Sequence, residues 1–221
     1  WRSWGSRSYR QLCASTEARQ EQATSRIRAA YLGGEVLSFE QKHTSVTTDF
    51  GHGLGDIITN HAAKLPVGQL TFAQTIFALT QELPYNFGVV TQSLQETDSR
   101  FNTGSMRQIY SPDVRCANEL VIDELARKMR LDPLAFRRKF LRDKRAEAAL
   151  DKVAEIGDWG RSMPEGTAQG IAIHKEYKGV TACLVEIDCR PETVGRTIRD
   201  AVTGPRVTKV VFAVDAGLVI N

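Results

Sequence analysis

The sequence predicts an α+β fold, of mixed α/β type, in which a β-hairpin and further strands flank a three-helix segment. Residues 25–48 and 168–214 are rich in β-branched residues that alternate with polar ones, as is typical of strands. Between them, apolar residues of the 111–157 segment recur at helical spacing. The chain has 221 residues, of which 42% are hydrophobic, so it is long enough for one large domain or two small ones.

The N-terminal half begins with a polar segment, residues 1–24, which is weakly helical from Thr16 onward and which we separate from the rest of the chain. A hairpin over 25–48 is expected to turn at Gly33-Gly34. The elements that follow are a glycine-rich loop at 50–56, a turn at 65–68, a helix over 71–83 and a strand over 87–93.

The helical segment carries the clearest local signals. Ser111 supplies an N-cap with Pro112 at the first helical position, and Asp132-Pro133 repeats that pattern. Helices are therefore expected from Ser111 to about residue 130, from Asp132 to about 141, and over about 145–156, where Gly157 ends the third. Strands over 170–176, 182–189 and 207–214 complete the chain.

The composition excludes a mainly disordered chain, because 29 basic and 26 acidic residues nearly balance and aliphatic residues are plentiful. No apolar stretch approaches the roughly 18 residues that a membrane helix needs. None of the cysteines, Cys13, Cys116, Cys183 and Cys189, forms a CxxC pair. Cys183 and Cys189 would lie about 20 Å apart along a strand, too far for a disulfide. We therefore expect reduced and mostly buried thiols.

Positive charge is concentrated in residues 127–145, which contain nine basic residues and only two acidic ones, Asp132 and Asp143. A solvated helical surface or a subunit contact is favoured, because no aromatic platform or nucleic-acid motif accompanies the charge. A non-catalytic module that binds nucleic acid or protein through this segment is the alternative hypothesis.

Most catalytic motifs are missing. The glycine cluster at 51–56 has Asp56 where a dinucleotide fingerprint needs glycine, so a flexible loop is the better interpretation. No two of the histidines (His43, His52, His61 and His174) have metal-ligand spacing, and no metal ligands are assigned. His174 alternates with apolar residues and is expected to be a hydrogen-bonded strand histidine. A GxSxG elbow and a P-loop are lacking.

The loop at 103–107 has the residue types of a ligand site. Gly104 permits close approach of the backbone to a ligand, Ser105 is small, and Arg107 could meet anionic or electron-rich oxygens. The loop lies between a β region and the strongest helix, so it is a candidate binding loop.

The order of several motifs resembles the molybdopterin-binding large subunit of the xanthine dehydrogenase and aldehyde oxidase family, and within it the isoquinoline 1-oxidoreductase β-subunit branch. The resemblance spans roughly residues 24–221. It rests on the stretches 104–112, 118–126, 132–137, 159–160 with 166–174, 184–188 and 212–221.

This resemblance implies a molybdenum hydroxylase that oxidises an aldehyde or an N-heteroaromatic substrate with oxygen from water. It implies a molybdopterin cofactor and electron transfer to [2Fe–2S] clusters on an iron–sulfur partner subunit. The family's catalytic glutamate belongs to a Gly-Glu motif downstream of this chain, so no catalytic residue is assigned here. Neither a nucleic-acid partner nor a transmembrane segment is expected, and both a cytoplasmic and an exported location fit the family.

Carried over residue by residue, the resemblance assigns Gly104, Ser105, Met106 and Arg107 to cofactor binding. Met106 stands where the family commonly has an aromatic residue, which alters the pocket. Asp215, Gly217 and Asn221 match a connecting loop and are interpreted as structural. The chain starts at Trp1 without a methionine and ends at Asn221 within an apolar run. We therefore expect residues 25–221 to be a partial molybdopterin-binding domain, inactive by itself.

Overall fold

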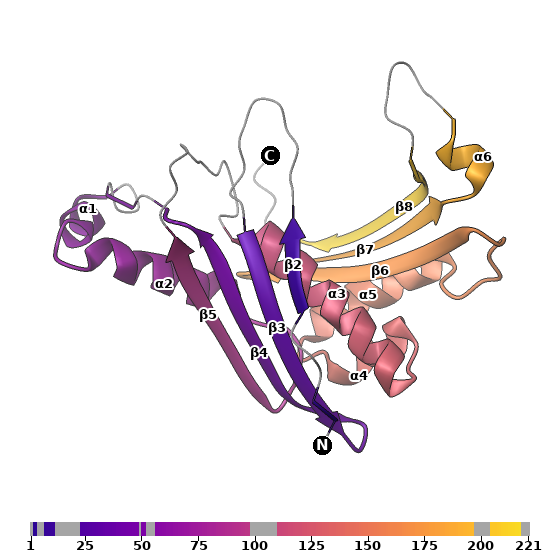
Figure 1. Ribbon diagram of the computed structural model, residues 1–221, viewed down its shortest axis with the longest axis horizontal. Coiled ribbons are helices and arrows are strands. Elements are labelled where there is room, and N and C mark those ends of the chain that lie inside the picture. The colour runs from indigo at the N-terminus through magenta and orange to yellow at the C-terminus, as the bar shows by residue number, and fades with distance from the viewer. Residues whose placement is uncertain are drawn as a thin grey trace. The chain divides into compact units, whose positions relative to one another are not determined.

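A computed structural model describes residues 2–3, 7–11, 23–48, 50–51, 56–97, 110–196 and 204–217, with side chains from Ala23 onward. The chain divides into an N-terminal unit, Trp1–Leu125, and a C-terminal unit, Ala126–Asn221 (Figure 1). Each unit contains one sheet and helices, which confirms the α+β class. The predicted separation of residues 1–24 from 25–221 stays a prediction.

The sheet of the N-terminal unit is built around the predicted hairpin. Strands β3 (Ala23–Leu32) and β4 (Glu35–Val46) pair antiparallel, and Gly33 and Gly34 turn the chain with φ of 59° and 84°. Positive φ at both positions is what a tight hairpin demands of glycine. Strand β5 (Val89–Thr97) pairs parallel with β4, and it begins two residues later than predicted.

The N-terminal segment contains strands that the sequence did not predict. Strand β1 (Arg2–Ser3) and strand β2 (Arg7–Gln11) both pair antiparallel with β3. The predicted weak helix after Thr16 lies outside the described residues as far as residue 22. Strand pairing across the chain overrides a polar composition that, taken locally, indicates little structure.

Helices α1 (Ile57–Ala63) and α2 (Gly68–Thr80) form a helical hairpin through the predicted turn. Helix α2 ends three residues before the predicted end, because a residue that precedes proline, here Pro84, is disfavoured in helical conformation. Its start at Gly68 packs closely on α1, since a Cβ at this position would lie 2.7 Å from the carbonyl oxygen of Ala63.

The core of the N-terminal unit lies between α2, the sheet and the start of helix α3 (Ser111–Met129). Phe77 of α2 and Tyr110 meet edge to face at 5.4 Å between ring centroids. The buried members of this cluster are Phe50, Ala73, Phe77, Leu94, Tyr110 and Val114.

The predicted helices of the 111–157 segment are confirmed: α3, α4 (Pro133–Phe140) and α5 (Lys144–Gly157). Asp132 caps α4 by accepting from the backbone N–H groups of Leu134 and Ala135, at 2.9 and 3.0 Å. Asp143 caps α5 through the N–H group of Arg145 at 2.9 Å. Of these two caps, the sequence predicted Asp132 and missed Asp143.

The predicted role of Gly157 as the residue that ends α5 is wrong. Gly157 is the last helical residue, and Asp158 takes the left-handed position with φ of 55°. A Cβ on Gly157 would instead lie 2.9 Å from Cδ2 of Leu184. Glycine is needed there because the helix end rests directly on the sheet.

The sheet of the C-terminal unit is antiparallel, in the order β6 (Thr167–Glu176), β7 (Gly179–Asp188) and β8 (Arg206–Asp215). These strands confirm the predicted ones. Helix α5 lies along one face of this sheet and contacts all three strands (Figure 1). The short helix α6 (Pro191–Val194) follows β7.

The expectation that most cysteines are buried is wrong for the described residues. Cys116 and Cys189 are exposed and Cys183 is partly buried, and none of the three forms a disulfide bond. Burial raises the pKa of the Cys183 thiol. Among the described helices, none has the length and apolar character needed to cross a membrane.

Candidate functional site

The predicted cofactor-binding residues Gly104, Ser105, Met106 and Arg107 lie outside the described residues, as do residues 52–55 of the glycine-rich loop. The structure describes the two ends of the 98–109 segment that holds the candidate loop. One end is the last residue of β5, and the other is Tyr110 with the start of α3.

The end of β5 is fixed to the neighbouring strand. The carbonyl oxygen of Thr97 accepts from the backbone N–H of Thr47 at 3.0 Å, and the Thr97 hydroxyl donates to the carbonyl oxygen of Ser45 at 3.2 Å. The carboxylate of Glu96 accepts from the N–H of Thr48 at 3.1 Å. The chain therefore enters the candidate loop from a strand end with satisfied hydrogen bonds.

The start of α3 is held by a hydrogen bond to the residue that follows α2. Ser111 is buried and is the first helical residue rather than the predicted cap, since the N–H of Val114 donates to the carbonyl of Tyr110. The Ser111 hydroxyl accepts from Nε2 of Gln81 at 2.9 Å. This bond ties α3 to the residue that follows α2.

Arg115 strengthens the same junction. Its guanidinium donates to the carbonyl oxygen of Thr80 at 2.9 Å and to that of Glu82 at 2.7 Å. These carbonyls lie at the C-terminal end of α2, where helix carbonyls lack partners within the helix. One turn later, Glu119 accepts from the hydroxyl of Tyr85 at 2.7 Å. The frame of the candidate loop is thus held by charged and polar side chains of α3.

Replacing Arg115 with lysine should lower the free energy of unfolding by about 1 kcal/mol, because one amine cannot serve both carbonyls in the geometry of the guanidinium. Chemical denaturation followed by circular dichroism measures the change. Arg127→Lys on the exposed part of α3 is the matched control. An Arg115→Lys variant as stable as the control would show that the two bonds contribute little.

A buried polar row crosses the sheet of the N-terminal unit. Ser25 and His43 lie opposite each other on β3 and β4, and the Ser25 hydroxyl lies 2.8 Å from Nδ1 of His43. Gln41 donates to Ser25 at 3.2 Å and accepts from Gln92 at 2.8 Å. The His43 ring stacks on Phe77 at 5.9 Å.

Burial lowers the pKa of His43 to about 4, so the ring is neutral at pH 7. Its Nε2 atom has no hydrogen-bond partner among the described residues. The sequence alone predicts no role for His43. The signal that could have found this role is the hairpin itself, since pairing about Gly33-Gly34 brings His43 close to Ser25.

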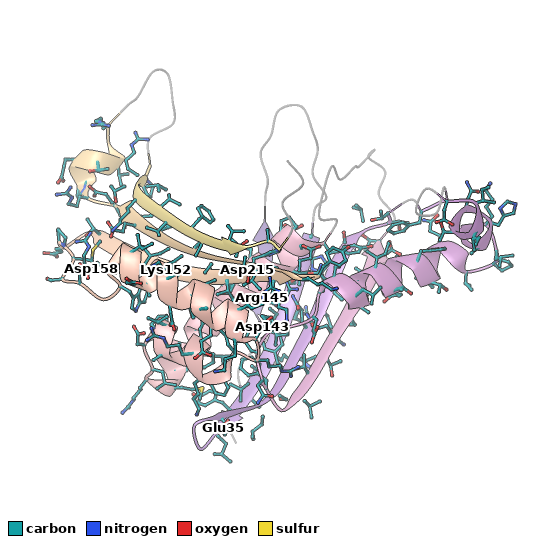
Figure 2. The ribbon with its side chains drawn as sticks, turned by 180° about the vertical axis from the view of Figure 1, so that it is seen from behind. Glu35, Asp143, Arg145, Lys152, Asp158 and Asp215 are labelled. Carbon is teal, nitrogen blue, oxygen red and sulfur yellow. The ribbon has the colours of Figure 1, made fainter. Side chains whose placement is uncertain are left out.

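A second charged cluster lies at the start of α5 in the C-terminal unit, where Figure 2 shows Asp143, Arg145 and Asp215 together. Arg145 donates from Nε and an amino group to the two carboxylate oxygens of Asp215, each at 2.6 Å, and to the carbonyl of Lys178 at 2.9 Å. Asp143 pairs with Lys175 at 2.9 Å. The Arg145 guanidinium holds the pKa of Asp215 below its usual range.

Asp215 therefore has the structural surroundings that the motif comparison suggested, because it ties the end of β8 to α5. Gly217, two residues further, has φ of 67°, which favours glycine. Asn221 lies outside the described residues.

Two further motif residues join a network at the other end of α5. Trp159 donates from its ring nitrogen to the carboxylate of Asp132 at 3.0 Å. The N–H of Gly160 donates to Oε1 of Gln169 at 3.0 Å, and Gln169 donates to Glu186 at the same distance. Each of these side chains therefore joins elements far apart in the sequence.

Glu186 is the centre of that network. It is buried and pairs with Arg161 at 2.8 Å. The hydrogen bond from Arg161, and after it that from Gln169, lower the pKa of this carboxyl. A charged carboxylate with two donors belongs to a structural network here, because it holds the chain after α5 against β6 and β7.

The remaining candidates, His174 and the basic segment 127–145, form hydrogen bonds or ion pairs with nearby side chains. His174 lies 3.2 Å from the Glu176 carboxylate, which confirms a hydrogen-bonded strand histidine. In the basic segment, Arg138 and Lys144 pair with Asp151 and Glu147, each at 2.6 Å, beside the Arg145 pair described above. Arg138, Lys144 and Arg145 are therefore matched by carboxylates within the C-terminal unit.

Comparisons by sequence find no match, either with a known protein family or with a curated protein. Comparison of folds does find similar solved structures. The aldehyde oxidoreductase from Desulfovibrio gigas superposes on 71% of this chain with a TM-score of 0.50 and 14% identity. The chain shares its fold with a segment of that enzyme. It spans only 18% of the length of the enzyme's chain.

Two other solved structures are similar at lower scores. The aldehyde oxidoreductase from Desulfovibrio desulfuricans matches 75% of this chain, with 13% identity, a TM-score of 0.46 and 18% of its own length covered. The CO dehydrogenase from Oligotropha carboxidovorans matches 71%, with 15% identity, a TM-score of 0.45 and 22% covered.

Within the described ranges, no group of three or more His, Cys, Asp or Glu side chains could hold a metal ion. The polar clusters join strands to one another and α3 to the segment after α2 in the N-terminal unit, and α5 and the chain after it to strands in the C-terminal unit. The predicted cofactor contacts at residues 104–107 stay a prediction.

Proposed function

We propose that this chain is part of the cofactor-binding subunit of a molybdenum hydroxylase. The observation that carries the proposal is the agreement of the motif order with the similarity of folds. The order of sequence motifs points to this family, and the fold matches a segment of an aldehyde oxidoreductase over 71% of the chain.

The proposed reaction oxidises an aldehyde or an N-heteroaromatic substrate with oxygen taken from water. In such an enzyme the molybdopterin supplies the redox chemistry, and the protein supplies binding and orientation. Gly104, Ser105, Met106 and Arg107 are the proposed contacts. The frame around Ser111 and Arg115 would hold this loop in place, because both ends of the 98–109 segment are hydrogen-bonded to other elements.

The proposed activity needs more polypeptide than these 221 residues. The chain corresponds to 18% of the length of the aldehyde oxidoreductase, and no catalytic glutamate is assigned in it. We therefore propose that its partners are the rest of a molybdopterin-binding subunit and an iron–sulfur subunit that accepts the electrons. The isoquinoline 1-oxidoreductase branch is the proposed branch of the family.

The test uses the complete gene product, produced together with its iron–sulfur partner. Arg107→Ala should lower aldehyde- or heterocycle-dependent dye reduction by about tenfold or more, because an arginine beside the reacting centre orients it, while the melting temperature stays unchanged. Arg127→Ala is the control and should keep full turnover. Full turnover of Arg107→Ala, or a gene without a downstream Gly-Glu loop, would contradict the proposal.

The same assignment predicts the behaviour of the 221-residue chain by itself. Purified from a host that makes molybdopterin, it should contain far less than one molybdenum per chain and show no turnover, because one loop cannot enclose the cofactor. Elemental analysis and a dye-reduction assay measure both. Stoichiometric molybdenum together with turnover would show that the chain is a complete enzyme.

A further inference from the structure

The sheet of the N-terminal unit has a polar, positively charged face that points away from α2. Helix α2 packs on the opposite face, where Phe77 stacks on the ring of His43. Strands β3, β4 and β5 lie side by side (Figure 1), and alternate residues of each strand point outward. The charged residues of β3 and β4 on this side form a cationic face (Arg26, Arg28, Glu40 and Lys42), and its three basic side chains are exposed.

Two like charges lie directly opposite each other on the cationic face. Arg26 is the register partner of Lys42, whereas the next outward pair along the strands, Arg28 and Glu40, has opposite charges. Opposite charges across two strands stabilise a sheet, and like charges directly opposite each other destabilise it. An anion bound between Arg26 and Lys42 would remove this repulsion.

The cationic face holds more positive charge than its own residues neutralise. Its one carboxylate, Glu40, lies 4.0 Å from the Arg28 guanidinium and 3.7 Å from Nζ of Lys42, close to the upper limit for an ion pair. Among the described residues, none forms a hydrogen bond or an ion pair with the Arg26 guanidinium. The charge of Arg26 is therefore available to an anion from outside the chain.

The surroundings of Arg26 and Lys42 indicate a reversible contact rather than a permanent one. Every described residue next to them on the outward side of β3, β4 and β5 is polar, namely Thr24, Arg28, Glu40, Thr44, Thr91, Ser93 and Gln95. Obligate interfaces are mainly hydrophobic, and permanent burial of several charges costs desolvation energy. A face of this composition is suited to remain in water when the rest of a longer subunit is present.

We propose that the cationic face binds a carboxylate-rich segment of a partner protein. The Arg26 guanidinium can hold a carboxylate through two parallel hydrogen bonds, and Lys42 adds a second positive charge. The hydroxyl group of Ser93, which lies opposite Lys42 on β5, offers a further donor. The contact is weak and sensitive to salt, because ions in solution screen exposed charges.

Other polyanions match the cationic face less well. Nucleic-acid binding typically neutralises about 6–10 phosphates or stacks bases on aromatic rings, and anionic membranes attract clusters of about 4–8 basic residues. The described part of this face has three basic side chains and no aromatic ring. A short run of carboxylates is the anion whose charge it matches.

Fluorescence anisotropy with a labelled oligoglutamate peptide tests the proposal, on both the 221-residue chain and the complete gene product. Both should bind the peptide, and the affinity should fall as salt rises. Arg26→Glu should raise the dissociation constant by about tenfold or more, because an attraction becomes a repulsion. The same variant sets a carboxylate opposite Lys42, so the chain should unfold at the same or a higher denaturant concentration. The loss of binding would then not come from misfolding.

Arg127→Glu is the matched control, because it makes the same change of charge at an exposed arginine in the basic segment 127–145. It should leave the dissociation constant unchanged. An equal effect of the two variants, or no binding at low salt, would overturn the proposal. So would binding by the 221-residue chain that the complete gene product lacks, since the rest of the subunit would then cover the face. Tighter binding of a single-stranded oligonucleotide or of phosphatidylserine vesicles, lost in Arg26→Glu, would overturn the assignment to a protein partner. None of these measurements needs cofactor or turnover, so they stand apart from the proposed enzyme function.

Discussion

The N-terminal unit is expected to lose about 3 kcal/mol of stability as the pH falls from 6.5 to 4, because of His43. Burial lowers the pKa of this side chain from its usual 6.5 to about 4, and each pKa unit corresponds to about 1.4 kcal/mol. Between these pH values His43 is protonated in the unfolded chain and neutral in the folded chain, so the free energy of unfolding declines with falling pH. Above pH 6.5 both states are neutral and the loss disappears.

The structural cause is the surroundings of the ring. A charged imidazole donates from both nitrogens, but among the described residues Nδ1 has a partner, Ser25, and Nε2 has none. The ring packs against Phe77 and Tyr110, whose ring centroids are 5.9 and 6.3 Å from that of His43. Protonation would therefore leave a buried charged donor without a partner, which is costly.

Denaturation at a series of pH values, with hydrogen exchange in peptides of the N-terminal unit, measures this loss. His43→Gln should flatten the profile between pH 6.5 and 4, because glutamine can bond Ser25 without titrating. His61→Gln on the exposed helix α1 is the control and should keep the wild-type profile. Carboxylates with lowered pKa values, such as Glu186 and Asp188, lose their contribution progressively below about pH 5. The difference between the wild-type and His43→Gln profiles therefore isolates the histidine. A wild-type profile that is flat down to pH 4 would refute the role of His43.

Gly157→Ala is expected to destabilise the C-terminal unit by about 1–2 kcal/mol. The added methyl group would lie 2.9 Å from Cδ2 and 3.1 Å from Cγ of Leu184, a side chain with no exposed surface. Overpacking of a closed core costs about 1–3 kcal/mol. The better helix propensity of alanine offsets at most about 1 kcal/mol of that cost.

The expected sign is opposite to that of most glycine replacements within helices. Gly170→Ala is the matched control, since a Cβ at Gly170 of β6 has no neighbour within 4 Å, and it should change stability by less than about 0.5 kcal/mol. Chemical denaturation of both variants, with hydrogen exchange in α5 and β7, gives the comparison. If Gly157→Ala proved as stable as the wild type, the helix end could move away from β7.

Features that depend on neighbours along the chain could be predicted from the sequence. The Asp132-Pro133 start of α4 and the Gly33-Gly34 turn follow from local hydrogen bonding and backbone freedom, and both are present. The helical spacing of the 111–157 segment and the alternation of the later strands are equally local. The α+β class follows from their order.

The candidate site likewise has a part that the sequence predicts and a part that only the folded chain reveals. The sequence alone nominated residues 104–107, through residue type and a resemblance in motif order. It did not find the frame around them, because Arg115 acts on carbonyls 33 and 35 residues earlier in the chain. No spacing rule connects residues so far apart, since only the folded chain brings them together.

Composition and local pattern thus determined the elements of this protein and the loop to test for cofactor binding. Tertiary structure alone decided that β2 joins the first sheet, that Gly157 serves packing rather than helix termination, and that His43 is neutral. In each case the deciding partner is distant in sequence: β3, Leu184 and Phe77. Burial, close packing and strand pairing depend on what the fold places opposite a residue, which its neighbours in the chain do not specify.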